Sequence, residues 1–281
     1  MDDRQFGDWI RLLENRVGLF IPPERKSFLI SGIRSRMREI GCHDYREYYN
    51  YLSGDCLQAQ EWSLLVDLLT VHETCFFRHE SSMRLVAEDL LPAAFGRGQS
   101  FRAWSVGCAT GEEAYSLAML ADDYCAARAG QYYFGVTGTD ISLPSLHQAR
   151  EGVYLERRLK DIPEAFRDRY CCTLEGQHFR VTEGLRKRVC FSQLNLRDLE
   201  KAPFAGLDLI YCQNLLIYYD RERRLQIVNQ LAEFLCPGGV LVLGPGEILN
   251  WQHPNMEKVC YRDTLAYRCT REAHPVRDER I

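Results

Sequence analysis

Apolar residues recur at helical spacing through the first third of the chain. Phe6, Trp9 and Leu13 lie three or four positions apart, which predicts a first helix with one buried face. The same spacing predicts further helices within residues 22–41, 44–52, 61–69 and 81–91. We therefore expect an all-helical domain over residues 1–92, and the proline and glycines that follow predict a linker over residues 93–99.

From residue 100 onward, short apolar runs alternate with helical segments. The expected strands are residues 101–106, 132–139, 189–194, 207–211 and 240–244, with a last antiparallel pair at residues 258–261 and 264–269. The expected helices are residues 113–128, 145–151 and 221–235. This alternation is typical of an α/β domain with a doubly wound, parallel sheet. We expect the domain to span residues 100–270, before a charged, disordered tail over residues 271–281.

The alternation breaks over residues 161–188, which predicts a small inserted β-subdomain. Apolar runs at residues 170–173 and 178–181 flank a turn and predict a hairpin. The segment from Val189 onward can continue this antiparallel ribbon.

A glycine turn joins the first expected strand of the α/β domain to its first expected helix. Gly107 and Gly111 lack Cβ atoms, so the backbone can bend sharply and a bulky ligand can approach it. The helix opens with Glu112 and Glu113, which repel a phosphate but suit a cation or a ribose hydroxyl. The pattern favours a ligand with positive charge and hydroxyls, and the alternative is a turn without a ligand.

Asp140 follows the second expected strand. In a doubly wound sheet the carboxyl ends of neighbouring strands form one crevice, where an acid can accept hydrogen bonds from ribose hydroxyls. We therefore expect Gly107 and Asp140 to face the same ligand. Alternatively, Asp140 caps the helix that follows.

Composition and charge exclude several classes of partner. The 281 residues carry a net charge of −4 with a pI near 6.0, which gives no reason to expect a nucleic acid. The 12 cysteines include no Cys-x-x-Cys pair and the N-terminus shows no secretory signal, which favours a reducing cytoplasm. Apolar runs are too short to span a bilayer. We expect a cytoplasmic monomer without a metal site or membrane insertion.

Two further patterns place charge beside apolar residues. Arg34, Arg36 and Arg38 surround the apolar face of the second expected helix, either as a solvated surface or as a docking site for an acidic helix. Residues 70–78 read TVHETCFFR, where two aromatic residues precede Arg78. Core packing with a surface arginine explains that pattern as well as a functional loop does.

With residues 70–78, 104–116, 138–154 and 208–220 considered together, the chain resembles the CheR family of chemotaxis methyltransferases. Members of that family use S-adenosylmethionine to esterify glutamate side chains of chemoreceptors. The resemblance implies a class I methyltransferase fold, Rossmann-like, with a mainly parallel sheet and a C-terminal antiparallel strand. It also implies an all-α N-terminal domain and the inserted β-subdomain, which binds a receptor tail in some members.

The resemblance assigns roles residue by residue. It implies that the following residues bind the cofactor: His72, Thr74, Arg78, Gly107, Glu113, Asp140, Asn195, Leu196, Gln213 and Asn214. Within this set, Glu113 meets the methionine end, Asp140 the ribose, and Asn195 and Leu196 the adenine. Arg78 and Tyr218 are expected to orient the substrate carboxylate, while Arg34, Arg36 and Arg38 dock the acidic receptor helix.

The chain also departs from the family pattern. His72 replaces a usual asparagine, Gln213 an arginine and Ala114 a proline, and residues 243–247 read LGPGE in place of a Gly-His-Ser-Glu pattern. These departures indicate a divergent member, which we place with a PilK-like pilus chemosensory paralogue. The alternatives are a methyltransferase with another substrate and a non-catalytic adaptor that binds the cofactor or the receptor.

Overall fold

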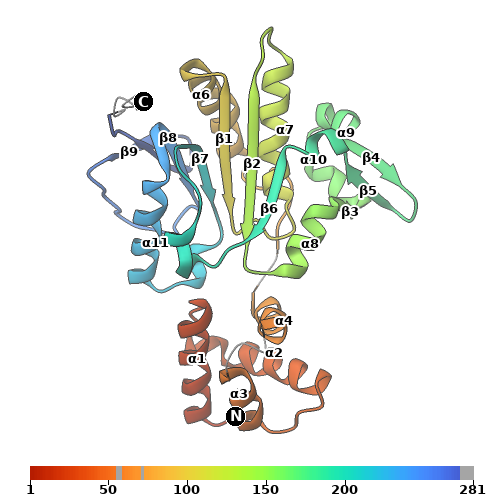
Figure 1. Ribbon diagram of the computed structural model, residues 1–281, viewed down its shortest axis with the longest axis vertical. Coiled ribbons are helices and arrows are strands. Elements are labelled where there is room, and N and C mark those ends of the chain that lie inside the picture. The colour runs from red at the N-terminus through yellow and green to blue at the C-terminus, as the bar shows by residue number, and fades with distance from the viewer. Residues whose placement is uncertain (55–58, 71–72, 273–281) are drawn as a thin grey trace, which may run out of the picture.

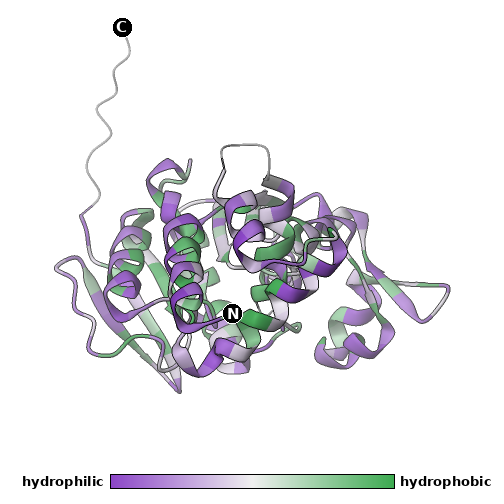
Figure 2. Ribbon diagram, turned by 90° about the horizontal axis from the view of Figure 1, so that it is seen from below, coloured by the Kyte–Doolittle hydropathy of each residue, from purple (hydrophilic) through white to green (hydrophobic). Residues whose placement is uncertain are grey.

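The computed structural model describes residues 1–54, 59–70 and 73–272. The first part is the expected all-helical domain, drawn in red and orange at the bottom of Figure 1. Its elements are α1 (Asp3–Val17), η1 (Pro23–Arg25), α2 (Lys26–Glu39), α3 (Tyr45–Ser53) and α4 (Ala59–Leu69). In Figure 2 the same helices carry both hydrophilic and hydrophobic stretches, which fits helices that bury one face.

A buried ion pair joins three of these helices. Arg36 in α2 donates from Nε and Nη2 to the two carboxylate oxygens of Glu61 in α4, at 2.9 and 2.6 Å. The Tyr48 hydroxyl of α3 donates to the same carboxylate at 2.7 Å. Arg36 is only 7% exposed. The expectation that Arg36 belongs to a docking surface was therefore wrong, because its guanidinium is used to hold the domain together.

The second part is built on a seven-stranded sheet with the order β6-β2-β1-β7-β8-β10-β9. The strands are β1 (Ser100–Val106), β2 (Tyr133–Asp140), β6 (Val189–Gln193), β7 (Leu207–Cys212), β8 (Leu235–Leu243), β9 (Met256–Tyr261) and β10 (Thr264–Cys269). The first five are parallel, and β10 pairs antiparallel with both β8 and β9. The chain leaves β1 toward β2 and β6, then returns to β7 on the other side of β1. The strand order therefore reverses between β1 and β7, where open α/β sheets bind ligands.

Helices cover both faces of this sheet (Figure 1). They are α5 (Glu80–Leu85), η2 (Val86–Leu90), α6 (Leu91–Arg97), α7 (Glu112–Ala126), α8 (Leu143–Glu151), η4 (Leu196–Lys201), η5 (Leu216–Tyr218) and α11 (Arg221–Glu233). Strand residues alternate between the two cores, since Ala103 and Leu209 pack with α7 whereas Trp104 and Ile210 pack with α11.

The expected linker over residues 93–99 was wrong. Residues 80–97 form a helical run through α5, η2 and α6, and Leu91, Ala94 and Phe95 are buried in the core of the sheet domain. The middle section has π-helical geometry, which fits Pro92, because a proline has no N–H to donate four residues back. This run therefore packs with the sheet and not with the N-terminal helices.

The inserted subdomain begins earlier than expected. Its sheet has the order β3-β5-β4, formed by β3 (Val153–Leu155), β4 (Cys171–Leu174) and β5 (His178–Val181), with η3 (Glu156–Asp161), α9 (Glu164–Tyr170) and α10 (Glu183–Arg186) around it. The predicted hairpin is confirmed as β4 and β5. Val189 does not continue this ribbon, because β6 pairs parallel with β2 in the main sheet.

The expected tail starts with an ordered residue. Arg271 donates to the carbonyls of Ala232 and Leu235 at 2.9 and 3.0 Å, and to the carboxylate of Glu233 at 2.8 Å. Residues 273–281 lie outside the described part of the chain. Among the described helices, none has both the length and the apolar character needed to cross a membrane.

The buried pair gives a stability prediction. The substitution Arg36→Met leaves the Glu61 carboxylate buried without its cation. We therefore expect the free energy of unfolding, measured by urea titration, to fall by about 3–5 kcal/mol. The exposed Arg38→Met is the matched control and should change it by less than about 0.5 kcal/mol. Equal effects of the two substitutions would contradict the structural role of Arg36.

Candidate functional site

A cavity lies where the carboxyl ends of β1, β2 and β7 meet the end of the helical domain. It is lined by Val17, Leu19, Thr70, Glu73, Thr74, Cys75, Arg78, Met83, Gly107, Ala109, Glu113, Thr139, Asp140, Ile141, Leu194, Leu196, Tyr211, Gln213, Asn214, Leu215, Tyr218 and Tyr219. The wall therefore combines apolar side chains with carboxyl, amide and hydroxyl groups, as in pockets for small organic ligands.

The glycine turn and Asp140 form one side of the cavity. Gly107 has φ +71°, and a Cβ there would lie 2.7 Å from the side chain of Leu215. The Asp140 carboxylate accepts hydrogen bonds from the backbone N–H groups of Ala109 and Ser142, both at 2.9 Å. Ser142 itself is the N-cap of α8. Asp140 therefore ties the ends of β1 and β2 together at the cavity, and the alternative that it caps the helix is not realised.

Glu113 stands in the first turn of α7 and faces the same cavity. Its Oε1 accepts a hydrogen bond from the Ser105 hydroxyl at 2.7 Å. Burial, with a smaller contribution from the Glu247 carboxylate, raises the pKa of Glu113 to about 8, although the Ser105 hydroxyl and the Arg78 guanidinium oppose the shift. A cation close to Glu113 would favour its ionised form.

The segment of residues 73–78 is held by its two aromatic side chains. Phe76 is buried against Tyr154 and Phe179 of the inserted subdomain, with ring centroids 5.0 and 5.9 Å apart. Phe77 has φ +52°, and its N–H donates to the Ser116 hydroxyl of α7 at 3.0 Å. The aromatic residues do pack in a core, as one interpretation of the sequence held. That packing also places Thr74 and the exposed Arg78 at the cavity.

Glu247 holds the loop between β7 and α11. Its Oε1 accepts from the N–H of Leu216 at 2.9 Å and its Oε2 from the N–H of Gly244 at 2.8 Å. Leu216 is the first residue of η5, which carries Tyr218 to the cavity wall. Asn214 precedes it with φ +59°, and its amide contacts His79 at 3.4 Å. The buried carboxylate of Glu247 therefore fixes the loop that presents Asn214 and Tyr218.

The helical domain closes the cavity from below. Val17 and Leu19, at the end of α1, line it. The N–H of Phe20 donates to the carbonyl of Tyr218 at 2.9 Å, and Arg197 donates to the carbonyl of Glu14 at 3.1 Å. The cavity is therefore formed by both domains.

The structure brings most of the expected site residues together. Those that line the cavity are Thr74, Arg78, Gly107, Glu113, Asp140, Leu196, Gln213, Asn214 and Tyr218. Asn195 does not line it, because its side chain caps η4 and reaches the carbonyl of Arg16 at 3.4 Å. His72 lies outside the described residues.

Several site residues were not singled out by the sequence patterns. Val17 and Leu19 look like ordinary core positions, and Tyr211 lies within an apolar strand run. Glu247 appeared only as part of an unusual motif. The position of Tyr211, one residue before the end of β7, could have indicated that its side chain lies near the cavity.

Two family models match the chain. The one described as "CheR methyltransferase, all-alpha domain" matches residues 4–70, and the one described as "CheR methyltransferase, SAM binding domain" matches residues 72–265. The chain belongs to the CheR methyltransferase family. Its larger domain binds S-adenosylmethionine and has the class I methyltransferase fold expected from the sequence. The two matches meet near residue 71, well before the expected boundary at residue 92.

Individual CheR relatives span most of the chain. A chemotaxis protein methyltransferase of Borreliella burgdorferi is 31% identical over 85% of this chain and 86% of its own length. That of Escherichia coli K12 is 29% identical over 90% and 86%. A probable biofilm formation methyltransferase, WspC of Pseudomonas aeruginosa, is 32% identical over 94% of this chain but 61% of its own length. These names confirm the family but give no support to the expected pilus branch.

The raised pKa of Glu113 gives a pH prediction for the cofactor-free protein. The folded state holds this proton up to about pH 8, whereas the unfolded state releases it near the ordinary value of 4.5. The proton therefore stabilises the fold at pH 4.5, and this contribution is lost as the pH rises to 8. We expect Glu113→Gln to gain thermal stability relative to wild type between pH 5 and pH 8.5. A difference in melting temperature that stays constant over this range would contradict the assignment.

Proposed function

We propose that this chain transfers a methyl group from S-adenosylmethionine to glutamate side chains on the cytoplasmic helices of chemoreceptors. The observation that carries the proposal is that Arg78 and Tyr218 reach the same cavity as Glu113 and Asp140. Arg78 and Tyr218 can donate hydrogen bonds to an incoming carboxylate, whereas Glu113 and Asp140 suit a cationic cofactor. The chemotaxis names of the relatives support the substrate class.

The side chains present fit S-adenosylmethionine. Glu113 would accept hydrogen bonds from its ammonium group and Asp140 from its ribose hydroxyls. Leu196, Leu194 and Ile141 offer apolar surface for the adenine. When bound, the cofactor supplies an already activated methyl group.

The reaction asks the protein for alignment more than for acid–base chemistry. A glutamate side chain is already ionised at neutral pH, so no residue has to remove a proton from it. The task of the site is to hold the carboxylate oxygen in line with the methyl group and to exclude water. Val17 and Leu19 of the helical domain close the cavity and so help to exclude water from it.

Arg78 and Tyr218 divide the alignment of the carboxylate between them. The Arg78 guanidinium donates from Nη1 to the carbonyl of Glu73 at 2.8 Å, which fixes the orientation of the group. Its other N–H groups can then donate to a carboxylate. Tyr218 can donate a single hydrogen bond from its hydroxyl. Its position is set by the backbone bonds that Glu247 and Phe20 make with its loop.

The exposed basic residues of α2 form the docking surface for the receptor helix. Arg34 and Arg38 are exposed and border a shallow groove with Ser31 and Ser35. Arg34 donates to the Tyr45 hydroxyl at 2.6 Å, which holds its side chain against α3. A helix with acidic residues around its methylated glutamates would find complementary charge there.

Paired substitutions separate the substrate and cofactor roles. We expect Tyr218→Phe to lower kcat about 10- to 100-fold and to leave the affinity for S-adenosylhomocysteine within about threefold, because one hydrogen bond to a charged group is lost. Asp140→Ala should instead weaken that affinity more than about tenfold. Labelled methyl transfer and calorimetry measure the two effects. Tyr133→Phe, at the opposite end of β2, is the control, and full turnover by Tyr218→Phe would remove Tyr218 from the site.

Charge reversal tests the docking surface. The double variant Arg34→Glu, Arg38→Glu should raise KM for a receptor cytoplasmic fragment about tenfold at low salt, with the difference shrinking in high salt. Its affinity for S-adenosylhomocysteine should not change. Arg4→Glu, an exposed position on α1, controls for net charge. An unchanged KM in the double variant would exclude α2 as the docking surface.

A further inference from the structure

His79 joins the two segments that carry the substrate-orienting side chains. It directly follows Arg78 and is the N-cap residue of α5. Its imidazole Nε2 lies 3.4 Å from the amide Nδ2 of Asn214, in the loop that leads to Tyr218. Because Arg78, Asn214 and Tyr218 all line the cavity, His79 connects two parts of the cavity wall.

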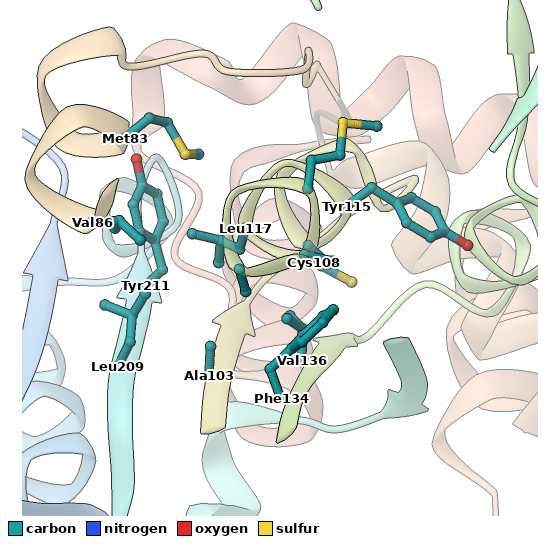
Figure 3. Packing of buried hydrophobic residues seen from close by; sticks show 14 of the residues in the cluster. Met83, Val86, Ala103, Cys108, Tyr115, Leu117, Phe134, Val136, Leu209 and Tyr211 are labelled. Carbon is teal, nitrogen blue, oxygen red and sulfur yellow. The ribbon is translucent and has the colours of Figure 1, made fainter. Parts of the chain in front are cut away.

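Packing fixes the two elements that make this contact. Met83 in α5 lies beside the ring of Tyr211 in β7 (Figure 3), and both side chains belong to the core of the sheet domain. One residue earlier in α5, the Ser82 hydroxyl accepts a hydrogen bond from Nε2 of Gln213 at 3.1 Å. Since α5 is held against the end of β7 in this way, the contact between the imidazole and the amide has a defined geometry.

The contact requires a neutral imidazole. An amide nitrogen can only donate, so Nε2 of His79 is the ring nitrogen without a hydrogen. With Nδ2 of Asn214 on this side, the amide oxygen is turned away from the ring. A protonated imidazole carries N–H groups on both nitrogens and would face the amide N–H with another donor. The amide then has to turn by about 180°, which exchanges its donor and its acceptor.

The surroundings of His79 keep it neutral at physiological pH. Burial lowers the pKa of His79 below its ordinary value of 6.5, and the Arg78 guanidinium lowers it further. Asp263, in the turn between β9 and β10, opposes this shift, as does the amide, whose oxygen can accept from a protonated ring. On α5, the Glu80 carboxylate is engaged by the Arg84 guanidinium at 2.6 Å. The ring therefore takes up a proton only in mildly acidic solution.

We propose that His79 is a positioning residue for methyl transfer, which acts through the Asn214 amide and works only with a neutral imidazole. This inference rests on the proposed function, because the residues that His79 positions line the same cavity. The neutral ring holds the amide in one orientation and so supports the loop that presents Tyr218. When the ring is protonated, the amide turns, the loop loses this support, and turnover falls.

The pH profile of kcat separates positioning from a purely structural role. Labelled methyl transfer to a receptor cytoplasmic fragment is measured from pH 8.5 to pH 5 with saturating S-adenosylmethionine. Receptor glutamates, with a pKa of about 4.3, stay mostly ionised over this range, so a fall near pH 6 belongs to the enzyme. The variant His79→Gln keeps an acceptor but does not titrate, whereas His79→Leu removes the acceptor. His147→Gln, at an exposed histidine of α8, is the control.

We expect kcat of wild type and of His147→Gln to fall about 3- to 10-fold between pH 7.5 and pH 5, because one hydrogen bond is lost. His79→Gln should stay within about threefold of the wild-type plateau and show no such fall. His79→Leu should lie about 3- to 10-fold below the plateau at every pH. By NMR, which needs no turnover, the imidazole of His79 should titrate at the midpoint of the wild-type fall.

Other results would overturn the inference. A flat profile in wild type, or a fall that persists in His79→Gln, would show that His79 does not set the pH dependence. An imidazole that titrates away from the midpoint would show the same. Lower thermal stability with an unchanged pH profile would leave His79 a structural role alone. His79→Gln keeps the test decisive if His79→Leu does not fold. If wild type labels no receptor fragment at any pH, the proposed function itself fails, and the inference fails with it.

Discussion

Two carboxylates, those of Asp140 and Glu247, hold the loops of this site in place at the carboxyl ends of the parallel strands. Asp140 accepts N–H groups from Ala109 and Ser142, and Glu247 accepts those of Leu216 and Gly244. Glu113 accepts the Ser105 hydroxyl. A carboxyl group can be buried at low cost only where donors surround it, so Asp140 and Glu247 fix the backbone that supplies their donors. These bonds hold the loops that line the cavity.

The two domains complete one site because the loops held by these carboxylates are also the loops that contact the helical domain. Tyr218 shows this most directly, since its side chain lines the cavity while its carbonyl accepts the N–H of Phe20. The inserted subdomain contributes in the same way through Phe179 and Tyr154, which pack on Phe76. The helical domain and the inserted subdomain therefore both contact the loops that form the cavity.

The sequence predicted the parts of the site that follow from local chain geometry. Gly107 and Asp140 stand at strand ends and Glu113 opens the helix that follows the first strand, where the alternation of strands and helices already implies a shared crevice. Residues that act through packing were not predictable in this way. The burial of Arg36 depends on Glu61, 25 residues away, and the helix at residues 91–97 forms despite its proline and glycine because Phe95 and Leu91 pack on the sheet. Asn195 was assigned by resemblance, and the structure uses it as a helix cap.

The most direct test of the account is to map the methylated residues on a purified receptor cytoplasmic fragment after incubation with this protein and labelled S-adenosylmethionine. Transfer by alignment onto an ionised carboxylate predicts base-labile methyl esters on glutamate side chains, found by mass spectrometry within the acidic stretches of the receptor helices. Label that resists base, or that sits on nitrogen or sulfur atoms, would contradict the account. So would an unlabelled receptor in the presence of bound cofactor.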